Sequence, residues 1–151
     1  MAAHPAYRDR MAEKKLHFDR EGLSAFLDEA FPAAARPSFG QIEFVNLGHV
    51  RMMLEPRPEM MRPGDILSGP TLMALIDGAA YAVVLAHVGP VAMAVTHTLN
   101  VTFLRACHFE TVVADARLLK LGRRLATIDV RLWQGSDDHL VAQSTVGYAL
   151  P

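Results

Sequence analysis

The chain has 151 residues, 51% of them hydrophobic, and a formal net charge of −1 at pH 7. This length accommodates one domain with its own core and excludes two. Acidic and basic residues are scattered without a concentrated basic face, so we expect no nucleic-acid partner.

Cysteine usage and the N-terminal sequence both indicate a cytoplasmic protein. Cys107 is the single cysteine, which excludes an intrachain disulfide and a cysteine-based zinc cluster and suits a reducing compartment. We expect Cys107 itself to be a buried, unreactive thiol. Residues 1–15 are rich in charge and are not followed by the apolar segment of a signal peptide.

The first predicted element is an amphipathic helix over residues 21–31, ended by Pro32. Its apolar side chains recur at helical spacing at Leu23, Phe26, Leu27 and Ala30. Residues 33–39 are expected to form a connection.

Residues 42–54 predict a β-hairpin, because two short apolar runs flank the turn sequence Asn46-Leu47-Gly48. The next segment, residues 55–64, contains three prolines and a glycine. Such a composition is typical of a loop, and we expect a loop there.

Ser68-Gly69-Pro70 begins the helix that the sequence predicts most strongly. Ser68 or Gly69 is suited to cap it, and Pro70 fits the first turn because that turn does not use its N–H groups. Residues 71–87 are nearly all apolar or small, which predicts a helix buried on almost every side. Asp77 and His87 interrupt the apolar stretch, which also contains many alanines. A buried helix is therefore favoured over a membrane span, and no membrane partner is expected.

The remaining sequence predicts a series of antiparallel strands. Residues 91–103 alternate with a period of two, and large apolar side chains at the odd positions predict that His97 is a core histidine. Further strands are expected over residues 111–121, 125–133 and 140–149. Segregated helices and strands indicate the α+β class, with the central helix in the concave side of a curved sheet.

Asp77 is the first candidate for chemistry, because it lies within the most apolar helix of the chain. An ionised carboxylate is costly to bury without partners. Two interpretations remain open. Asp77 is either hydrogen-bonded in a structural role or prepared for general acid–base or nucleophilic work.

The start of this helix is the second candidate. The first amide groups of a helix point outward at the positive end of its dipole, and Gly69 has no side chain to obstruct a ligand. An acyl carbonyl placed there would have its developing negative charge stabilised. Ser68 is not surrounded by a Gly-x-Ser-x-Gly motif, so a capping role is favoured over a nucleophilic one.

Together these residues resemble the hotdog-fold thioesterases of the phenylacetic-acid-degradation type. The usual pattern is Gly-x-x-His-Gly-Gly, followed by a helix with a catalytic Asp or Glu nine residues after the His. The matching segment is Gly64-Asp-Ile-Leu-Ser68-Gly69-Pro70-Thr-Leu-Met-Ala-Leu-Ile-Asp77. Downstream, Thr96 and the run from Asn100 to Phe103 match the long strand of the family. Residues 120–127 resemble a turn whose basic side chains approach coenzyme A phosphates.

The resemblance implies one hotdog domain over residues 1–151, with a helical extension over 1–39 and a hotdog core over 40–151. In this fold a curved antiparallel sheet wraps around one long central helix. Homodimers or homotetramers are expected by resemblance, and also because an edge strand ending near Phe103 could pair with its copy. The high apolar content also suits a subunit interface.

The function implied is hydrolysis of an acyl-CoA thioester, with coenzyme A as part of the substrate and no separate cofactor or metal. By resemblance, the Gly69 N–H polarises the carbonyl, while Asp77, from the neighbouring subunit's side of a shared cleft, acts as base or nucleophile. Thr96 orients the water or the carboxylate, and Ser68 provides a polar contact. The residues expected to bind substrate are Asn100, Arg105, Arg123 and Arg124.

Two departures from the family pattern leave an alternative open. Ser68 replaces the family's His, and Met61 or Arg62 stands where an Asn is often found. A non-catalytic acyl-CoA binding protein is therefore the second hypothesis, although the retained Asp77 and Thr96 favour an enzyme. A hotdog dehydratase would need a His near the helix start, and none is present.

Overall fold

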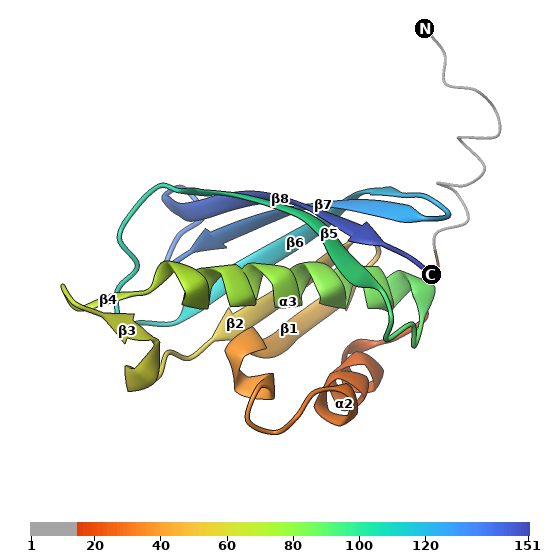
Figure 1. The fold of residues 1–151 in the computed structure, drawn as a ribbon, viewed down its shortest axis with the longest axis horizontal. Coiled ribbons are helices and arrows are strands. Elements are labelled where there is room, and N and C mark those ends of the chain that lie inside the picture. Colours follow the sequence, from red (N-terminus) through yellow and green to blue (C-terminus); the bar gives the residue numbers. More distant parts are fainter. Residues whose placement is uncertain (1–14) are drawn as a thin grey trace, which may run out of the picture.

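The computed structural model describes residues 15–151, and the first part of the expected N-terminal extension, residues 1–14, lies outside the described residues. A six-stranded antiparallel sheet wraps around one face of a single long helix, α3 (Gly69–Val88) (Figure 1). The strand order is β1-β2-β6-β7-β8-β5. The strands are β1 (Gln41–Asn46), β2 (His49–Leu54), β5 (Val95–Phe103), β6 (Val112–Leu121), β7 (Leu125–Trp133) and β8 (Leu140–Ala149). The predicted class, α+β with a central helix in a curved sheet, is confirmed.

The ends of α3 follow the capping signals in the sequence. The Ser68 Oγ accepts a hydrogen bond from the Thr71 N–H at 3.3 Å, so Ser68 is the N-cap. Gly89, with a φ of 88°, ends the helix and donates its N–H to the Leu85 carbonyl. The helix is long and apolar enough to cross a membrane, but 67% of its most apolar window is buried within the protein.

The concave face of the sheet supplies most of the core around α3. Alternate side chains of β6 and β7 point toward the helix and are buried, and those of β2 and β8 complete the layer. Several of these positions are alanines, including Ala114, Ala116 and Ala126. Small side chains there allow the sheet to approach a helix whose own surface is rich in alanine.

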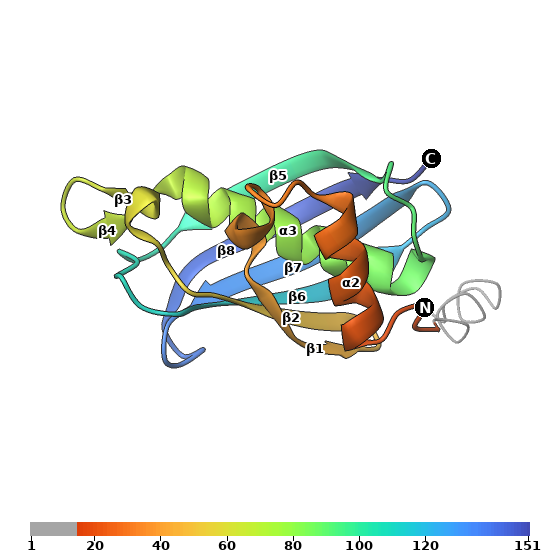
Figure 2. The ribbon, with the colours of Figure 1, turned by 90° about the horizontal axis from the view of Figure 1, so that it is seen from below.

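The other side of α3 is covered by the N-terminal extension (Figure 2). It consists of α2 (Arg20–Ala30) and a short 3₁₀ helix, η1 (Arg36–Phe39), where a connection was expected. Leu23 and Leu27 of α2 are buried, as the helical spacing predicted. Phe39 lies directly on the backbone of α3, because a Cβ atom at Gly78 would come within 2.8 Å of its ring.

Part of the predicted loop is ordered differently from our expectation. Residues 55–64 include the 3₁₀ helix η2 (Pro58–Met60) and a strand, β3 (Met61–Arg62), which pairs with β4 (Ile66–Leu67). Positive φ angles at Gly64 (99°) and Asp65 (58°) turn the chain between the two strands. The loop prediction was therefore wrong for these residues, because the proline content concealed a tight hairpin.

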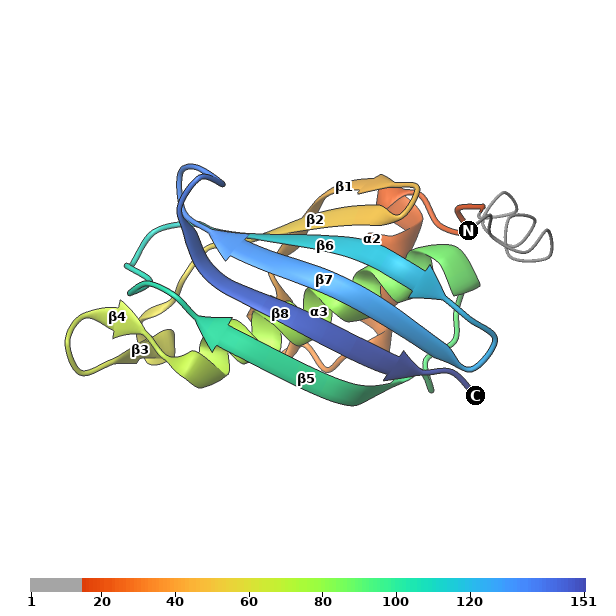
Figure 3. The same cartoon turned by 90° about the horizontal axis from the view of Figure 1, so that it is seen from above.

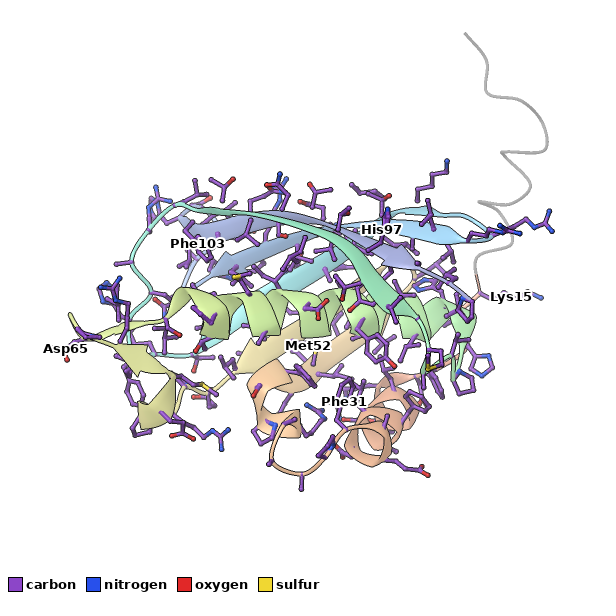
Figure 4. The ribbon with its side chains drawn as sticks, in the orientation of Figure 1. Lys15, Phe31, Met52, Asp65, His97 and Phe103 are labelled. Atoms are coloured by element: carbon purple, nitrogen blue, oxygen red, sulfur yellow. The ribbon has the colours of Figure 1, made fainter. Side chains whose placement is uncertain are left out.

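The strand expected over residues 91–103 begins only at Val95, and its alternation is interrupted. The pairing of β5 with β8 shifts between Thr96 and Thr98, which indicates a β-bulge at His97. His97 is exposed rather than in the core, so that prediction was wrong. The physical reason is that β5 is an edge strand (Figure 3). It pairs with β8 on one side, and no other strand of the sheet lies on its other side. Figure 4 labels His97 and Phe103 near the two ends of β5.

The convex face of the sheet is polar and carries a buried carboxylate. Asp115, only 3% exposed, accepts hydrogen bonds from His49 at 2.5 Å, Arg51 at 2.9 Å and Arg117 at 3.2 Å. Burial acts to raise the pKa of Asp115, but hydrogen bonds and charges from His49 and Arg51 lower it below its usual value. This network links β2 to β6 on the side of the sheet away from α3.

Replacing Gly78 by alanine tests the packing of the extension on α3. Alanine gains about 1 kcal/mol of helix propensity over glycine, but its Cβ would overlap Phe39 atoms 2.8–2.9 Å away. Overpacking of this kind costs about 1–3 kcal/mol. We expect Gly78→Ala to lower the free energy of unfolding measured by urea denaturation.

Gly69→Ala is the matched control, because a Cβ there makes only an ordinary 3.6 Å contact with Phe103. That variant should be as stable as the wild type or slightly more stable. A Gly78→Ala protein at least as stable as the wild type would contradict the packing described.

Candidate active site

Asp77 lies on the one stripe of α3 that is covered by neither the sheet nor the extension. The helix residues on either side of it, Ile76 and Gly78, are buried, whereas Asp77 is half-buried. Its side chain opens into a cleft of about 430 Å³. The sequence suggested a carboxylate within the core; the structure instead places it at a solvent-accessible boundary, where an ionised group costs less.

Two hydroxyl groups converge on the same oxygen of this carboxylate. The Asp77 Oδ1 accepts a hydrogen bond from the Thr96 Oγ1 at 2.7 Å and another from the Tyr148 Oη at 2.7 Å. Thr96 and Tyr148 are direct partners in the β5–β8 register, so the sheet presents both donors at one point. Within residues 15–151 no hydrogen bond reaches Oδ2, which is left to a water molecule or a substrate.

Tyr148 acts as a donor because its phenol does not ionise easily. Burial raises the pKa of Tyr148 well above its usual value, and the negative charge of Asp77 raises it further. The Tyr148 Oη also lies 3.2 Å from the main-chain carbonyl oxygen of Asp77. Tyr148 on β8 therefore contacts both the side chain and the backbone of Asp77.

Tyr148 was missed by the sequence analysis, whereas Thr96 was found through the family resemblance. The available signal was the alternation of residues 140–149, which places Tyr148 on the inward face of the last strand. Alternation does not reveal which strand lies next to it. Only the β5–β8 pairing brings Tyr148 opposite Thr96.

The start of α3 forms a separate cleft of about 230 Å³. Gly69 lies there near Phe103 and Arg105, eight residues before Asp77 and thus about 12 Å away along the helix axis. Within one chain the structure does not bring Gly69 and Asp77 together. The Ser68 hydroxyl is occupied by Thr71, whose Oγ1 lies 2.8 Å from the Ser68 Oγ. The capping interpretation of Ser68 is confirmed.

The residues expected to bind substrate are also dispersed. Arg105 donates to the Leu140 carbonyl at 2.8 Å, whereas the Arg124 carbonyl accepts from the Leu150 N–H at the opposite end of β8. That strand separates them by roughly 30 Å, so a shared phosphate site with Arg123 and Arg124 does not form within one chain. Asn100 lies midway along β5 with its side chain exposed.

Neither a metal cluster nor a reactive thiol accompanies this site in the described part of the chain. Residues 15–151 contain no group of three or more His, Cys, Asp or Glu side chains placed to hold a metal ion. Cys107 is 2% exposed, and burial, with a smaller contribution from Glu110, raises its pKa to about 11. The expectation that Cys107 is buried is confirmed.

Comparison with known proteins identifies the family. The sequence model of the thioesterase superfamily matches residues 64–141, which include Asp77, Thr96 and the whole of α3. The chain belongs to the thioesterase superfamily. The predicted hotdog fold and the resemblance to thioesterases of the phenylacetic-acid-degradation type are therefore confirmed.

Solved structures of superfamily members share this architecture. A provisionally named thioesterase from Silicibacter sp. TM1040 is 39% identical, covers 91% of this chain and 95% of its own, and has a TM-score of 0.82. A phenylacetic acid degradation-related protein from Ralstonia eutropha JMP134 is 26% identical over 83% of this chain and 98% of its own, with a TM-score of 0.73. A Streptococcus pneumoniae protein solved with coenzyme A shares the fold, at 19% identity, 74% and 84% coverage and a TM-score of 0.66.

The raised pKa of Tyr148 can be checked by ultraviolet titration of the tyrosines. The chain has 3 tyrosines, and Tyr148 should contribute nothing to the tyrosinate absorbance that develops near pH 10, because burial and Asp77 oppose its ionisation. We expect Tyr148→Phe to leave the amplitude near pH 10 unchanged. Burial also raises the pKa of Tyr81, so an ordinary, accessible Tyr148 would supply about a third to a half of that amplitude. A loss of this size in Tyr148→Phe would contradict the assigned environment.

Proposed function

We propose that the protein is an acyl-CoA thioesterase that hydrolyses the thioester to a free acid and coenzyme A, with Asp77 at the centre of the reaction. The observation that carries the proposal is the Asp77 carboxylate, which opens into a cleft while two hydroxyl donors hold its Oδ1. Membership of the thioesterase superfamily supports hydrolytic chemistry. Coenzyme A in the Streptococcus pneumoniae relative supports the type of thioester.

In the proposed reaction the Asp77 Oδ2 takes a proton from a water molecule in the cleft. The resulting hydroxide forms a bond to the thioester carbonyl carbon, and the C–S bond then breaks. The leaving thiolate recovers the proton from Asp77. Direct attack by Oδ2, followed by hydrolysis of the anhydride, uses the same geometry. In either route Thr96 and Tyr148 fix Oδ1, so that the other oxygen keeps one orientation.

The oxyanion contact is proposed to come from a second copy of the chain. Asp77 lies beside Thr96 near the start of β5, and Gly69 lies beside Phe103 at its end. Antiparallel pairing of β5 with its copy, centred near Asn100, would place Asp77 of one copy next to Gly69 of the other. The edge position of β5 and the half-exposed Val95 (51%) and Phe103 (49%) support such pairing.

The same antiparallel dimer would bring together basic residues that lie far from each other within one chain. Arg105 follows the end of β5, and Arg123 and Arg124 lie in the turn next to the other end of the β5–β8 pair. Antiparallel pairing would place Arg105 of one copy at the same end of the joined sheet as Arg123 and Arg124 of the other. We propose these arginines, with Asn100 at the seam, as contacts for the coenzyme A moiety.

A non-catalytic acyl-CoA binding protein is the second candidate function. The observation in its favour is the Ser68 hydroxyl, which is engaged in capping α3 instead of supplying the polar contact that the family's His provides. The hydrogen bonds to Asp77 favour catalysis, because an apolar side chain at that position would serve binding better.

Release of free thiol from a panel of acyl-CoAs tests the enzyme hypothesis. We expect turnover by the wild type and a decrease in kcat of about 10²–10⁴-fold in Asp77→Ala and Asp77→Asn, because both remove the base. Leu119→Ala is the matched control, since Leu119 is exposed and lies outside the site. Turnover that survives in both Asp77 variants would refute the assigned role. Acyl-CoA binding without any turnover would establish the second candidate.

Mixed dimers test the shared site. Gly69→Pro removes the proposed oxyanion N–H at a helix position where proline is tolerated, and Asp77→Ala removes the base. Each variant alone should be inactive, but a heterodimer purified through two different tags should regain about half of the wild-type activity, because one of its two sites is intact. The control is an Asp77→Ala/Asp77→Asn heterodimer, which must stay inactive. No recovery in the first heterodimer, with both proteins folded, would place Gly69 outside the site.

A further inference from the structure

A row of aromatic rings leads from the N-terminal extension to the candidate catalytic group. The Phe39 and Phe31 ring centroids are 4.6 Å apart, and Phe31 meets Tyr81 edge-on at 5.6 Å. Tyr81 lies 5.9 Å from Tyr148, the ring that donates to Asp77. All four rings line the 430 Å³ cleft into which Asp77 opens. Figure 4 labels Phe31 on the extension, on the side of α3 turned away from the sheet.

The structure fixes these rings independently of any ligand. Phe39 lies on the bare backbone of α3 at Gly78. The Tyr81 hydroxyl donates to the Ala92 carbonyl at 3.2 Å, and burial raises the pKa of Tyr81, so it remains a donor. Its polar atom is thus satisfied at the edge of the cleft, and the ring contributes apolar surface to the interior.

Three small residues also line the cleft. Ala92 and Ala94 line the cleft between the end of α3 and the start of β5, and Gly78 lies at its base. The short side chains of Ala92 and Ala94 take up little of the cleft. A cleft of this size is within the range of small-molecule pockets, roughly 300–1,000 Å³.

The charges of the residues that line the cleft indicate which part of an acyl-CoA it can bind. Asp77 is the one charged residue among those that line it, and no Lys or Arg in residues 15–151 does so. A coenzyme A phosphate would be repelled there. A second carboxylate on the acyl group would also be repelled, since no cation is present to pair with it.

We propose that this cleft is the acyl-binding pocket and that Phe31 and Phe39 of the N-terminal extension are specificity-determining residues. The pocket takes a compact, uncharged acyl group, either a single ring or a chain of medium length. The inference rests on the proposed thioesterase activity, and it adds the substrate class. The rings offer edges and faces to a flat or short apolar group, and Asp77 lies where its carbonyl would enter.

The test compares kcat/KM for acetyl-, phenylacetyl-, octanoyl-, palmitoyl- and succinyl-CoA in the wild type and two variants. We expect the wild type to prefer phenylacetyl or octanoyl groups and to reject succinyl. Ala92→Leu adds bulk at an exposed residue of the cleft. It should lower kcat/KM at least about tenfold for the preferred acyl group while acetyl-CoA is spared.

Phe31→Ala enlarges the pocket and should shift the preference toward larger acyl groups. Met93→Phe is the matched control, because Met93 neighbours Ala92 but is 72% exposed and does not line the cleft. That variant should keep the wild-type profile. An unchanged acyl profile in both Ala92→Leu and Phe31→Ala, with turnover intact, would overturn the pocket assignment and leave the thioesterase proposal standing.

Calorimetry with a non-hydrolysable octyl thioether of coenzyme A separates the pocket from the chemistry. If the wild type hydrolyses none of the substrates, the proposed function fails, but the thioether should still bind more weakly to Ala92→Leu than to Met93→Phe. Equal affinity in these two variants, or no binding to the wild type, would refute the pocket.

Discussion

The structure depends on the need to cover a helix that is apolar on almost every side. The six-stranded sheet covers one side of α3, and the N-terminal extension covers much of the other. Because both layers must fit closely, alanines line the contact with the sheet, and Gly78 admits Phe39 on the opposite side. A single stripe remains uncovered between them, and Asp77 lies on it. The candidate active site is therefore a consequence of incomplete coverage of the helix.

The register between β5 and β8 fixes the orientation of the Asp77 carboxylate in this opening. The β5–β8 pairing sets Thr96 opposite Tyr148, and both hydroxyls reach the same oxygen of Asp77. The bulge at His97 follows immediately and shifts the alternation of the strand. A one-residue slip in this register would turn one donor away from the cleft, so the sheet edge has to be specified accurately for the site to exist.

Ser68 stands where the family has a His, so in the proposed reaction the start of α3 would lack the polar contact which that His provides. Ser68 stabilises the helix as its cap, and its hydroxyl is engaged with Thr71 beside the first-turn amide of Gly69. In the proposed dimer the amide and the carboxylate come from different copies, and the extension provides the apolar surface beside them. Catalysis would then depend on the oxyanion contact and on a rigidly held Asp77.

Those elements and candidate catalytic residues that have a local signal could be predicted from the amino-acid sequence. Capping residues marked α3, period-two alternation marked the strands, and a carboxylate among alanines singled out Asp77. The sequence analysis was wrong about His97 and about part of residues 55–64, because an edge position and strands of only two residues leave little trace in periodicity. Tyr148, Phe31 and Phe39 reach the cleft through contacts between distant segments, so their place in the site became apparent only from the folded chain. Local patterns report burial, whereas the partner across a sheet or under a helix is set by packing of the whole chain.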